Sequence, residues 1–111
     1  MIVRIDEKEF KVEKADTFWK RFKGLMMRDN YMADKAMLIS PCNSIHMFFM
    51  KFPLTIVFID KQYKITDVKI GIKPWQVKLS LFKGSEAVFE IPYWGNENLK
   101  PKVGDYVAVI Q

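Results

Sequence analysis

The chain has 111 residues, of which half are apolar and 28% are charged, and its formal net charge is +5. This composition excludes a disordered chain, and the length predicts a single domain spanning residues 1–111. One cysteine and one histidine exclude an intramolecular disulfide and any metal site with several histidines.

The first elements expected along the chain are a β-hairpin and a helix. Residues 2–13 alternate apolar and polar side chains, which is typical of a hairpin. An amphipathic helix is expected from about Lys14, capped by Asp16 or Thr17. Its apolar stripe, at i, i+4, i+7 and i+8, consists of Phe18, Phe22, Leu25 and Met26. Gly24 is expected near the helix end, as a cap or where another backbone approaches closely.

From Ala36 onward the chain has the pattern of a sheet protein, with short apolar runs separated by turn residues. The expected strands are 37–39, 45–50, 54–59, 63–72, 87–91 and 106–110. Residues 54–59 are apolar on both faces, as in a central strand, whereas residues 73–85 have no clear pattern. We therefore expect an α+β fold: a compact, barrel-like, mostly antiparallel sheet with one main amphipathic helix near the N-terminus.

No stretch has the pattern of a signal peptide or the roughly 18 consecutive apolar residues of a membrane span. A single cysteine is also typical of proteins in a reducing compartment. These two features favour a cytoplasmic protein.

Several segments in order resemble a known family. Arg21–Arg28 resembles the pattern RxxGLMxR, Cys42–Met50 resembles CxSIHTFxM, and Lys51–Asp60 resembles a run containing PLDVVFLD. The closing pattern of spaced acidic and glycine residues is matched by Glu90, Gly95, Gly104 and Asp105. Thr55 and Met47 differ from the usual acidic residue and threonine. The family is domain-of-unknown-function family 192, found in bacteria and archaea. The resemblance implies a barrel-like α+β domain and no particular reaction.

Cys42, His46 and Met50 carry the soft and intermediate donor atoms that Cu(I) prefers. In an extended strand, Cys42 and His46 would lie roughly 13 Å apart at about 3.3 Å per residue. That separation favours ordinary packing and disfavours a cysteine nucleophile with a histidine base. A soft-metal or small-ligand site at these residues is the alternative, and no metal or cofactor is assigned.

Among the acidic residues, Glu90 is the strongest candidate for a special role. It lies in an apolar, strand-like run, and a buried carboxylate needs a partner. Glu90 and Asp105 could together support hydrolysis, but turn chemistry explains Asp105 adequately. No catalytic residue is assigned.

The positive charge is confined to two segments, 14–28 and 61–84, which together carry +9 while the remainder carries −4. The candidate basic patch consists of Lys20, Arg21, Lys23, Arg28, Lys69, Lys73 and Lys78. If the two segments fold onto one side, they could bind an anionic partner such as a nucleic acid. The structural alternative is that these residues form a solvent-exposed helix face and place lysines along strand edges, where they discourage edge pairing.

Trp75 and Trp94 flank expected turns, where aromatic side chains often reach the surface and dock a partner. The sequence as a whole favours a small non-catalytic binding or interaction module, with a protein partner preferred to a nucleic acid. The alternatives are the soft-metal or small-ligand binder and the anion binder.

Overall fold

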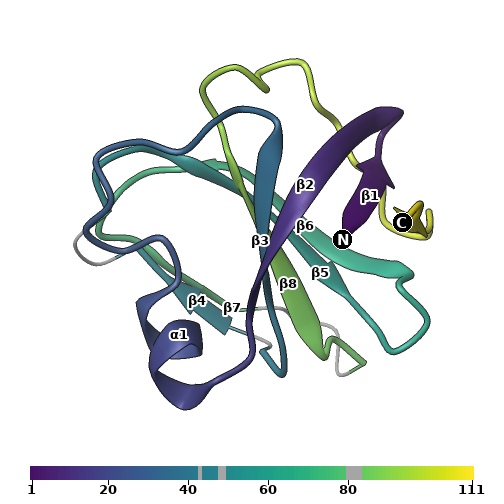
Figure 1. Cartoon of the computed structure of the whole chain (residues 1–111), viewed down its shortest axis with the longest axis horizontal. Helices are drawn as coiled ribbons and strands as arrows, with labels where there is room; N and C mark the ends of the chain where they lie inside the picture. Colours follow the sequence, from purple (N-terminus) through teal and green to yellow (C-terminus); the bar gives the residue numbers. More distant parts are fainter. Residues whose placement is uncertain (43, 48–49, 80–83) are drawn as a thin grey trace.

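The computed structural model describes all residues except 43, 48–49 and 80–83, and it leaves out the side chains of 18, 19, 44–46 and 77–79. Seven strands form one strongly curled sheet in the order β6-β5-β8-β3-β2-β1-β9 (Figure 1). These strands are β1 Ile2–Ile5, β2 Lys8–Ala15, β3 Lys35–Ile39, β5 Leu54–Ile59, β6 Ile65–Ile72, β8 Ala87–Pro92 and β9 Ala108–Val109. A separate two-stranded sheet pairs β4 Ser44–His46 with β7 Val77–Leu79, and the helix α1 spans Phe18–Lys23.

The expected N-terminal hairpin is confirmed. β1 and β2 pair in antiparallel fashion across a two-residue turn at Asp6 and Glu7, which both have positive φ. Turns of this kind match the right-handed twist of the flanking strands. β2 then runs parallel to β3, an arrangement that needs a long connection. Residues 16–34 supply that connection and include α1.

The C-terminal segment joins the two ends of the curled sheet. β9 pairs with β1, and just before it the backbone bonds to the start of β6. Ile65 N–H donates to the Asp105 carbonyl at 2.7 Å, and Val107 N–H donates to the Tyr63 carbonyl at 2.8 Å. These hydrogen bonds explain why the sheet curls into a half-barrel.

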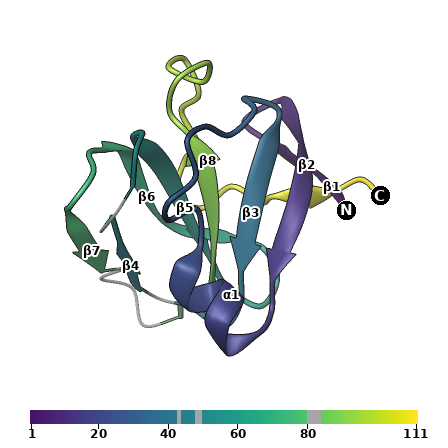
Figure 2. The same ribbon diagram turned by 60° about the vertical axis from the view of Figure 1, so that its left-hand side comes forward.

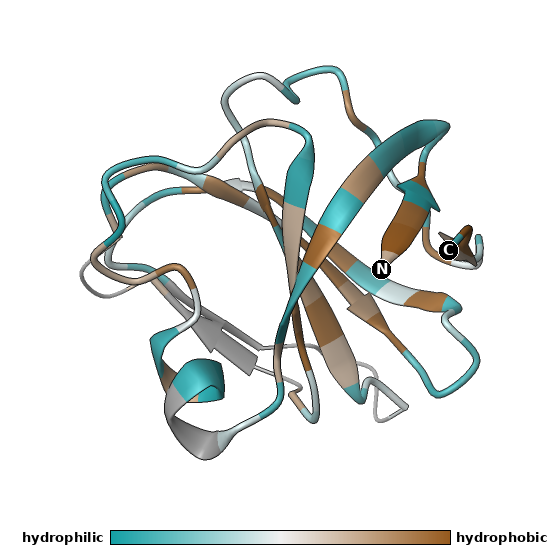
Figure 3. Ribbon diagram, in the orientation of Figure 1, coloured by the Kyte–Doolittle hydropathy of each residue, from teal (hydrophilic) through white to brown (hydrophobic). Residues whose placement is uncertain are grey.

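Both faces of the central strands are buried, each against its own apolar cluster. Along β8, Phe89 belongs to the first cluster, whereas Val88 belongs to the second. The first core cluster includes Val3, Ile5, Phe10, Leu38, Val57, Phe89 and Val107. The second core cluster, to which the turn after α1 contributes Leu25, includes Ala15, Leu25, Met37, Met47, Met50, Ile56, Phe58 and Val88. Figure 3 shows the apolar residues concentrated on the central strands and the polar ones in the turns.

The expected main helix is wrong, and with it the α+β class. α1 has only six residues, and no described helix is longer (Figure 2). Thr17 caps α1 as expected, because its side chain accepts a hydrogen bond from Lys20 N–H at 3.2 Å. The helix is capped at its other end by Gly24. Leu25 completed the apolar stripe in the sequence, yet it lies in the turn beyond the helix and is buried there. The protein is a curled half-barrel, nearly all sheet.

The later strands agree with expectation except in three places. The expected strand 106–110 is reduced to the two residues of β9. The expected strand 45–50 is shortened to β4, because Met50 N–H bonds back to the Met47 carbonyl in a turn; residues 48–49 lie outside the described part. The segment 73–85, which had no clear pattern, contains β7. Among the helices that the structure describes, none has the length and hydrophobicity needed to cross a membrane.

We predict that Phe89→Ala destabilises the protein by about 3–5 kcal/mol, because truncating a buried phenylalanine leaves a cavity. Phe89 is fully buried and packs edge-on against the Tyr63 ring, with centroids 6.3 Å apart. Urea unfolding measures the loss. Trp94→Ala, at an exposed position, is the control and should change stability by no more than about 0.5 kcal/mol. Equal effects of the two substitutions would contradict the assignment of the core.

Candidate functional site

The carboxyl group of Glu90 is buried in the middle of β8, as the sequence indicated. Its side chain is only 4% exposed. Glu90 stands opposite Met37 of β3 and Ile56 of β5, so apolar residues flank it on both sides. It lies on the face of the sheet against which the turn after α1 packs, at Gly24 and Leu25. An acidic side chain is therefore held where water cannot solvate it.

The turn after α1 is built against this carboxyl group. Gly24 has φ +50°, which favours glycine, and a β-carbon placed there would lie 2.8 Å from Glu90 Oε1. The backbone conformation and the nearby carboxyl group both favour glycine at this position, which caps the end of α1. The next residue, Leu25, is buried, and its backbone N–H bonds to the Glu90 carboxyl group.

This environment favours the neutral form of Glu90. Within the part of the chain that the structure describes, Oε1 has no hydrogen-bond partner. Burial raises the pKa of Glu90 to about 7, and the Leu25 N–H and the positive charge of Arg28 offset only part of that increase. Glu90 thus changes its charge near neutral pH.

A second charged group lies at the other side of the same turn. Arg28 donates to both carboxylate oxygens of Glu13, at 3.0 and 2.7 Å, and Tyr31 Oη donates to Glu13 Oε1 at 3.1 Å. The hydrogen bond from Arg28 lowers the pKa of Glu13, and burial raises the pKa of Tyr31. The Arg28 guanidinium also lies 5.4 Å from the centre of the Tyr31 ring. Glu13 therefore holds Arg28 in a bidentate pair.

A pocket of about 180 Å³ is lined by residues of β2, α1, the segment after α1 and β3. We call it the α1 pocket; its lining residues are Glu13, Lys14, Ala15, Lys20, Lys23, Gly24, Arg28 and Met37. Four of these side chains are cationic, and the one carboxylate, Glu13, is already paired with Arg28. At roughly 30 Å³ per water, the volume equals about six waters. The pocket thus has the size and charge to hold a small anion.

The seven basic residues expected to form a patch do not all gather in one place. Lys20, Lys23 and Arg28 line the α1 pocket, but the Arg21 guanidinium bonds to the Asp16 carbonyl at 3.0 Å. In the second basic segment, Lys69 of β6 pairs with Asp67 at 3.5 Å. Lys73 is exposed beyond the end of β6, and the Lys78 side chain lies outside the described part.

The residues of the suggested soft-metal site have different surroundings. Met50 is buried in the second core cluster, and Cys42 is partly buried against the same cluster. His46 lies in β4, but its side chain is outside the described part. No cluster of three histidine, cysteine or acidic side chains fit for a metal occurs among the described residues. The soft-metal site stays a prediction.

The two tryptophans expected at the surface are exposed. Trp75 is 58% exposed and Trp94 is 62% exposed. Trp94 lies in the loop that follows β8 (Figure 2), whereas Trp75 precedes β7. That either tryptophan binds a protein partner stays a prediction.

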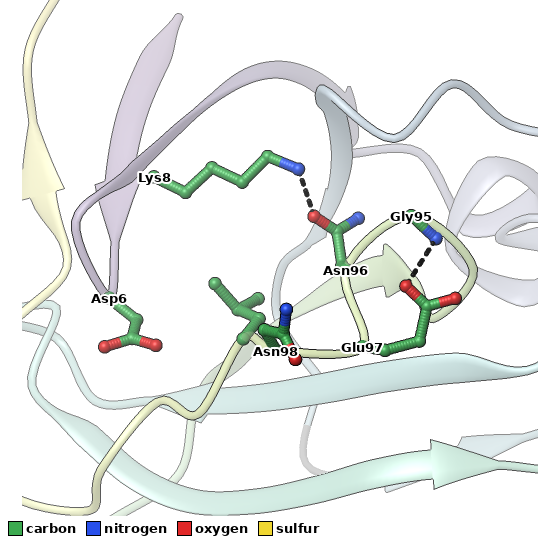
Figure 4. A pocket seen from close by; sticks show the side chains of 7 residues that line it. Asp6, Lys8, Gly95, Asn96, Glu97 and Asn98 are labelled. Carbon is green, nitrogen blue, oxygen red and sulfur yellow. Dashed lines mark hydrogen bonds between the residues drawn. The ribbon is translucent and has the colours of Figure 1, made fainter.

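A second pocket, of about 240 Å³, lies where the loop after β8 meets the N-terminal hairpin (Figure 4). Lys8 extends across it and donates to the Asn96 side chain. The Asn96 amide also donates to the carbonyls of Ala33 and Pro92, at 3.0 and 2.9 Å. These hydrogen bonds fasten the loop to its neighbours, which assigns Asn96 a structural role.

Sequence reasoning missed Glu13 and Tyr31. Glu13 belongs to a regular strand alternation, and nothing near it in the sequence signals that it binds Arg28. The signal that was present is Gly24, a glycine where a close approach was expected. Its neighbour is a side chain, Glu90, and not a backbone.

Comparison with known proteins gives consistent matches. The family model described as DUF192, uncharacterized ACR, matches residues 1–109. A UPF0127 protein of Pyrococcus abyssi is 35% identical, over 92% of this chain and 88% of its own length. A UPF0127 protein of Thermococcus sibiricus is 32% identical over 87% of this chain, and the match spans only 64% of that relative.

Two crystal structures share the fold. A protein of unknown function from Novosphingobium aromaticivorans has a TM-score of 0.84 and 23% identity, covering 97% of this chain and 84% of its own. A putative transcription regulator from Sinorhizobium meliloti has a TM-score of 0.82 and 23% identity, covering 96% and 90%. At these identities the likeness concerns the fold alone.

We predict that Glu90→Gln stabilises the protein at pH 8 and not at pH 5. The unfolded chain ionises Glu90 at its ordinary pKa of 4.5, whereas the folded protein keeps the proton to about pH 7. Stability from this group is therefore present at low pH and is lost as pH rises from 4.5 to about 7, by roughly 3 kcal/mol. Glutamine removes this loss. Urea unfolding at both pH values tests it, with the exposed Glu86→Gln as control; an unchanged pH dependence in Glu90→Gln would contradict it.

We also predict that Gly24→Ala destabilises the protein by about 1–3 kcal/mol, because alanine at this φ is strained and its methyl group meets Glu90. The comparison is Gly104→Ala, since Gly104 also has positive φ but open space around it. Thermal unfolding of both variants separates the two contributions. Equal losses would show that the contact with Glu90 adds nothing.

Proposed function

Because this chain belongs to the DUF192 family of uncharacterized proteins, its function has to be inferred from its own site, and we propose that it is a small non-catalytic module that binds an oxyanion in the α1 pocket. The single observation that carries the proposal is the lining of that pocket. Around one cavity meet Lys14, Lys20, Lys23 and Arg28. Among the described residues that line it, Glu13 is the only acidic one, and it is already paired with Arg28. An anion placed there gains several charge-assisted hydrogen bonds.

The size of the pocket indicates the class of ligand. Pockets for drug-sized molecules usually measure about 300–1,000 Å³, whereas the α1 pocket measures about 180 Å³. A phosphate or sulfate group fits this volume with some water. Such a group can be a free ion or the charged end of a larger molecule that extends into solvent.

The geometry also supports a preformed site. Glu13 fixes the Arg28 guanidinium through two hydrogen bonds, so this side chain is ordered before a ligand arrives. The contact of Gly24 and Leu25 with Glu90 fixes the end of α1, which carries Lys20 and Lys23. Preorganised groups lose less entropy on binding.

The setting of this module is part of the same proposal. We infer a reducing, cytoplasmic environment from the presence of a single cysteine in the chain. Phosphate-bearing metabolites and nucleic acids are then the available oxyanions, and the experiment separates them.

We expect sulfate to bind the wild-type protein and to shift the backbone amide signals of residues 23–28 in a nuclear magnetic resonance titration. Lys20→Gln combined with Lys23→Gln should lower the affinity at least about tenfold, because two charge-assisted contacts are lost. Lys64→Gln combined with Lys102→Gln changes the net charge equally at exposed positions and should have little effect.

Two results would overturn the proposal. One is equal weakening by the two double variants, which would indicate only a general electrostatic attraction. The other is binding of a short oligonucleotide that falls steeply between about 50 and 200 mM salt while sulfate neither binds nor competes. That result would favour an extended nucleic-acid surface over a small-oxyanion pocket.

A further inference from the structure

The wall of the α1 pocket separates it from a buried acid. Gly24 lines the pocket, and the same residue lies against Glu90, whose Oε1 is 2.8 Å from the position of a β-carbon on Gly24. Met37, directly opposite Glu90 in the sheet, also lines the pocket. Glu90 therefore lies one residue's thickness behind the surface that an anion would contact.

The groups that face Glu90 differ on its two sides. Toward the sheet, its neighbours Met37 and Ile56 are apolar and carry no charge. Toward the pocket, β2 contributes Glu13 and Lys14. Neither of the two strands that pair directly with β8 offers Glu90 a counter-ion at these positions.

The elements covering Glu90 carry the remaining charges. α1 contributes Lys20 and Lys23, and the segment after it contributes Arg28 and the phenol of Tyr31. Of these groups, Arg28 is the one whose charge lowers the pKa of Glu90. Arg28 is already held by Glu13, so it does not reach Glu90 Oε1, which has no partner among the described residues.

One guanidinium thus acts on three negative charges: Glu13, which binds it directly, Glu90 behind the wall, and an anion in the pocket. An arriving anion is neutralised by Arg28 and the lysines, which leaves less positive potential at Glu90. Two like charges close together in a low-dielectric environment repel strongly. The ionised form of Glu90 and the bound anion are therefore in conflict, whereas the protonated form is not.

We propose that Glu90 couples anion binding in the α1 pocket to proton uptake, so that the pocket binds its anion more tightly when Glu90 is protonated. This inference rests on the proposed function, because it concerns the same pocket. Glu90 acts here as a positioning residue, through the wall formed by Gly24 and Met37, and does not touch the anion.

The direction of the coupling follows from linkage. If protonated Glu90 favours the anion, then the bound anion must raise the pKa of Glu90 by the same free energy. Since that pKa is about 7 without a ligand, anion affinity should fall as pH rises through neutrality. With a single proton involved, the fall cannot exceed about tenfold per pH unit.

The experiment uses sulfate, because this anion does not titrate near neutral pH and any pH dependence then belongs to the protein. Calorimetric titrations from about pH 6 to pH 8 are run in two buffers of different ionisation enthalpy, which counts the protons taken up. The variants are Glu90→Gln, which imitates the protonated acid, and His46→Gln, which removes the only histidine in the chain. Glu86→Gln is an exposed acidic control.

We expect the wild-type protein, His46→Gln and Glu86→Gln to take up a fraction of a proton per sulfate and to bind more weakly at high pH. Glu90→Gln should bind sulfate with the same affinity throughout this range and take up no proton. Sulfate binding that is independent of pH in the wild-type protein would overturn the coupling and leave the proposed function standing. Retained pH dependence in Glu90→Gln would also overturn it.

A measurement on the wild-type protein does not depend on the variant folding. The carboxyl carbon signal of Glu90, followed by nuclear magnetic resonance against pH, should give a higher pKa with saturating sulfate than without it. An unchanged pKa refutes the coupling. If sulfate binds but is insensitive to Lys20→Gln with Lys23→Gln, the proposed function itself fails, and the inference fails with it.

Discussion

A buried carboxyl group that accepts a hydrogen bond from the Leu25 backbone amide is the constraint on which this architecture depends. Glu90 occupies a position in β8 that an apolar residue would fill at no electrostatic cost. A β-carbon on Gly24 would meet this carboxyl group, and the Leu25 amide donates to it. These two residues end α1 and turn the chain toward Arg28. The acid beneath the α1 pocket thus helps to place the end of α1, which carries Lys20 and Lys23, whereas Glu13 holds Arg28.

Several cations of this protein are already paired with carboxylates, so the charge available at the site is smaller than the net charge of its segment. The net charge of +5 reflects two segments that together carry +9, and the first of them supplies the four cations that line the α1 pocket. In the second segment, Lys69 is neutralised by Asp67 on its own strand. In the first segment, Arg28 binds Glu13 through hydrogen bonds and also interacts electrostatically with Glu90. A count of charges along the sequence therefore overstates the positive charge that is available to a ligand.

Sequence reasoning reached the strands and the separate members of the site, but not their contacts. The hairpin follows from a period-two pattern, and β5 and β8 follow from short apolar runs. Glu90 stands out because it interrupts such a run. The helix was overextended because Leu25 satisfies helical spacing while packing from a turn. The contact between Gly24 and Glu90 joins residues far apart in the chain, and no local pattern contains that information. The same is true of Glu13 and Arg28, which meet only because β2 runs beside the turn.

The closure of the sheet has a consequence for how the protein acquires its shape. The segment 104–109 bonds both to β1, near the N-terminus, and to the start of β6, in the middle of the chain. On the ribosome these two strands emerge long before the segment that connects them. Until that segment has been synthesised, the first core cluster lacks Val107 and both strand edges are open to other chains. The half-barrel is thus completed only after the segment 104–109 has been synthesised and has paired with both β1 and β6.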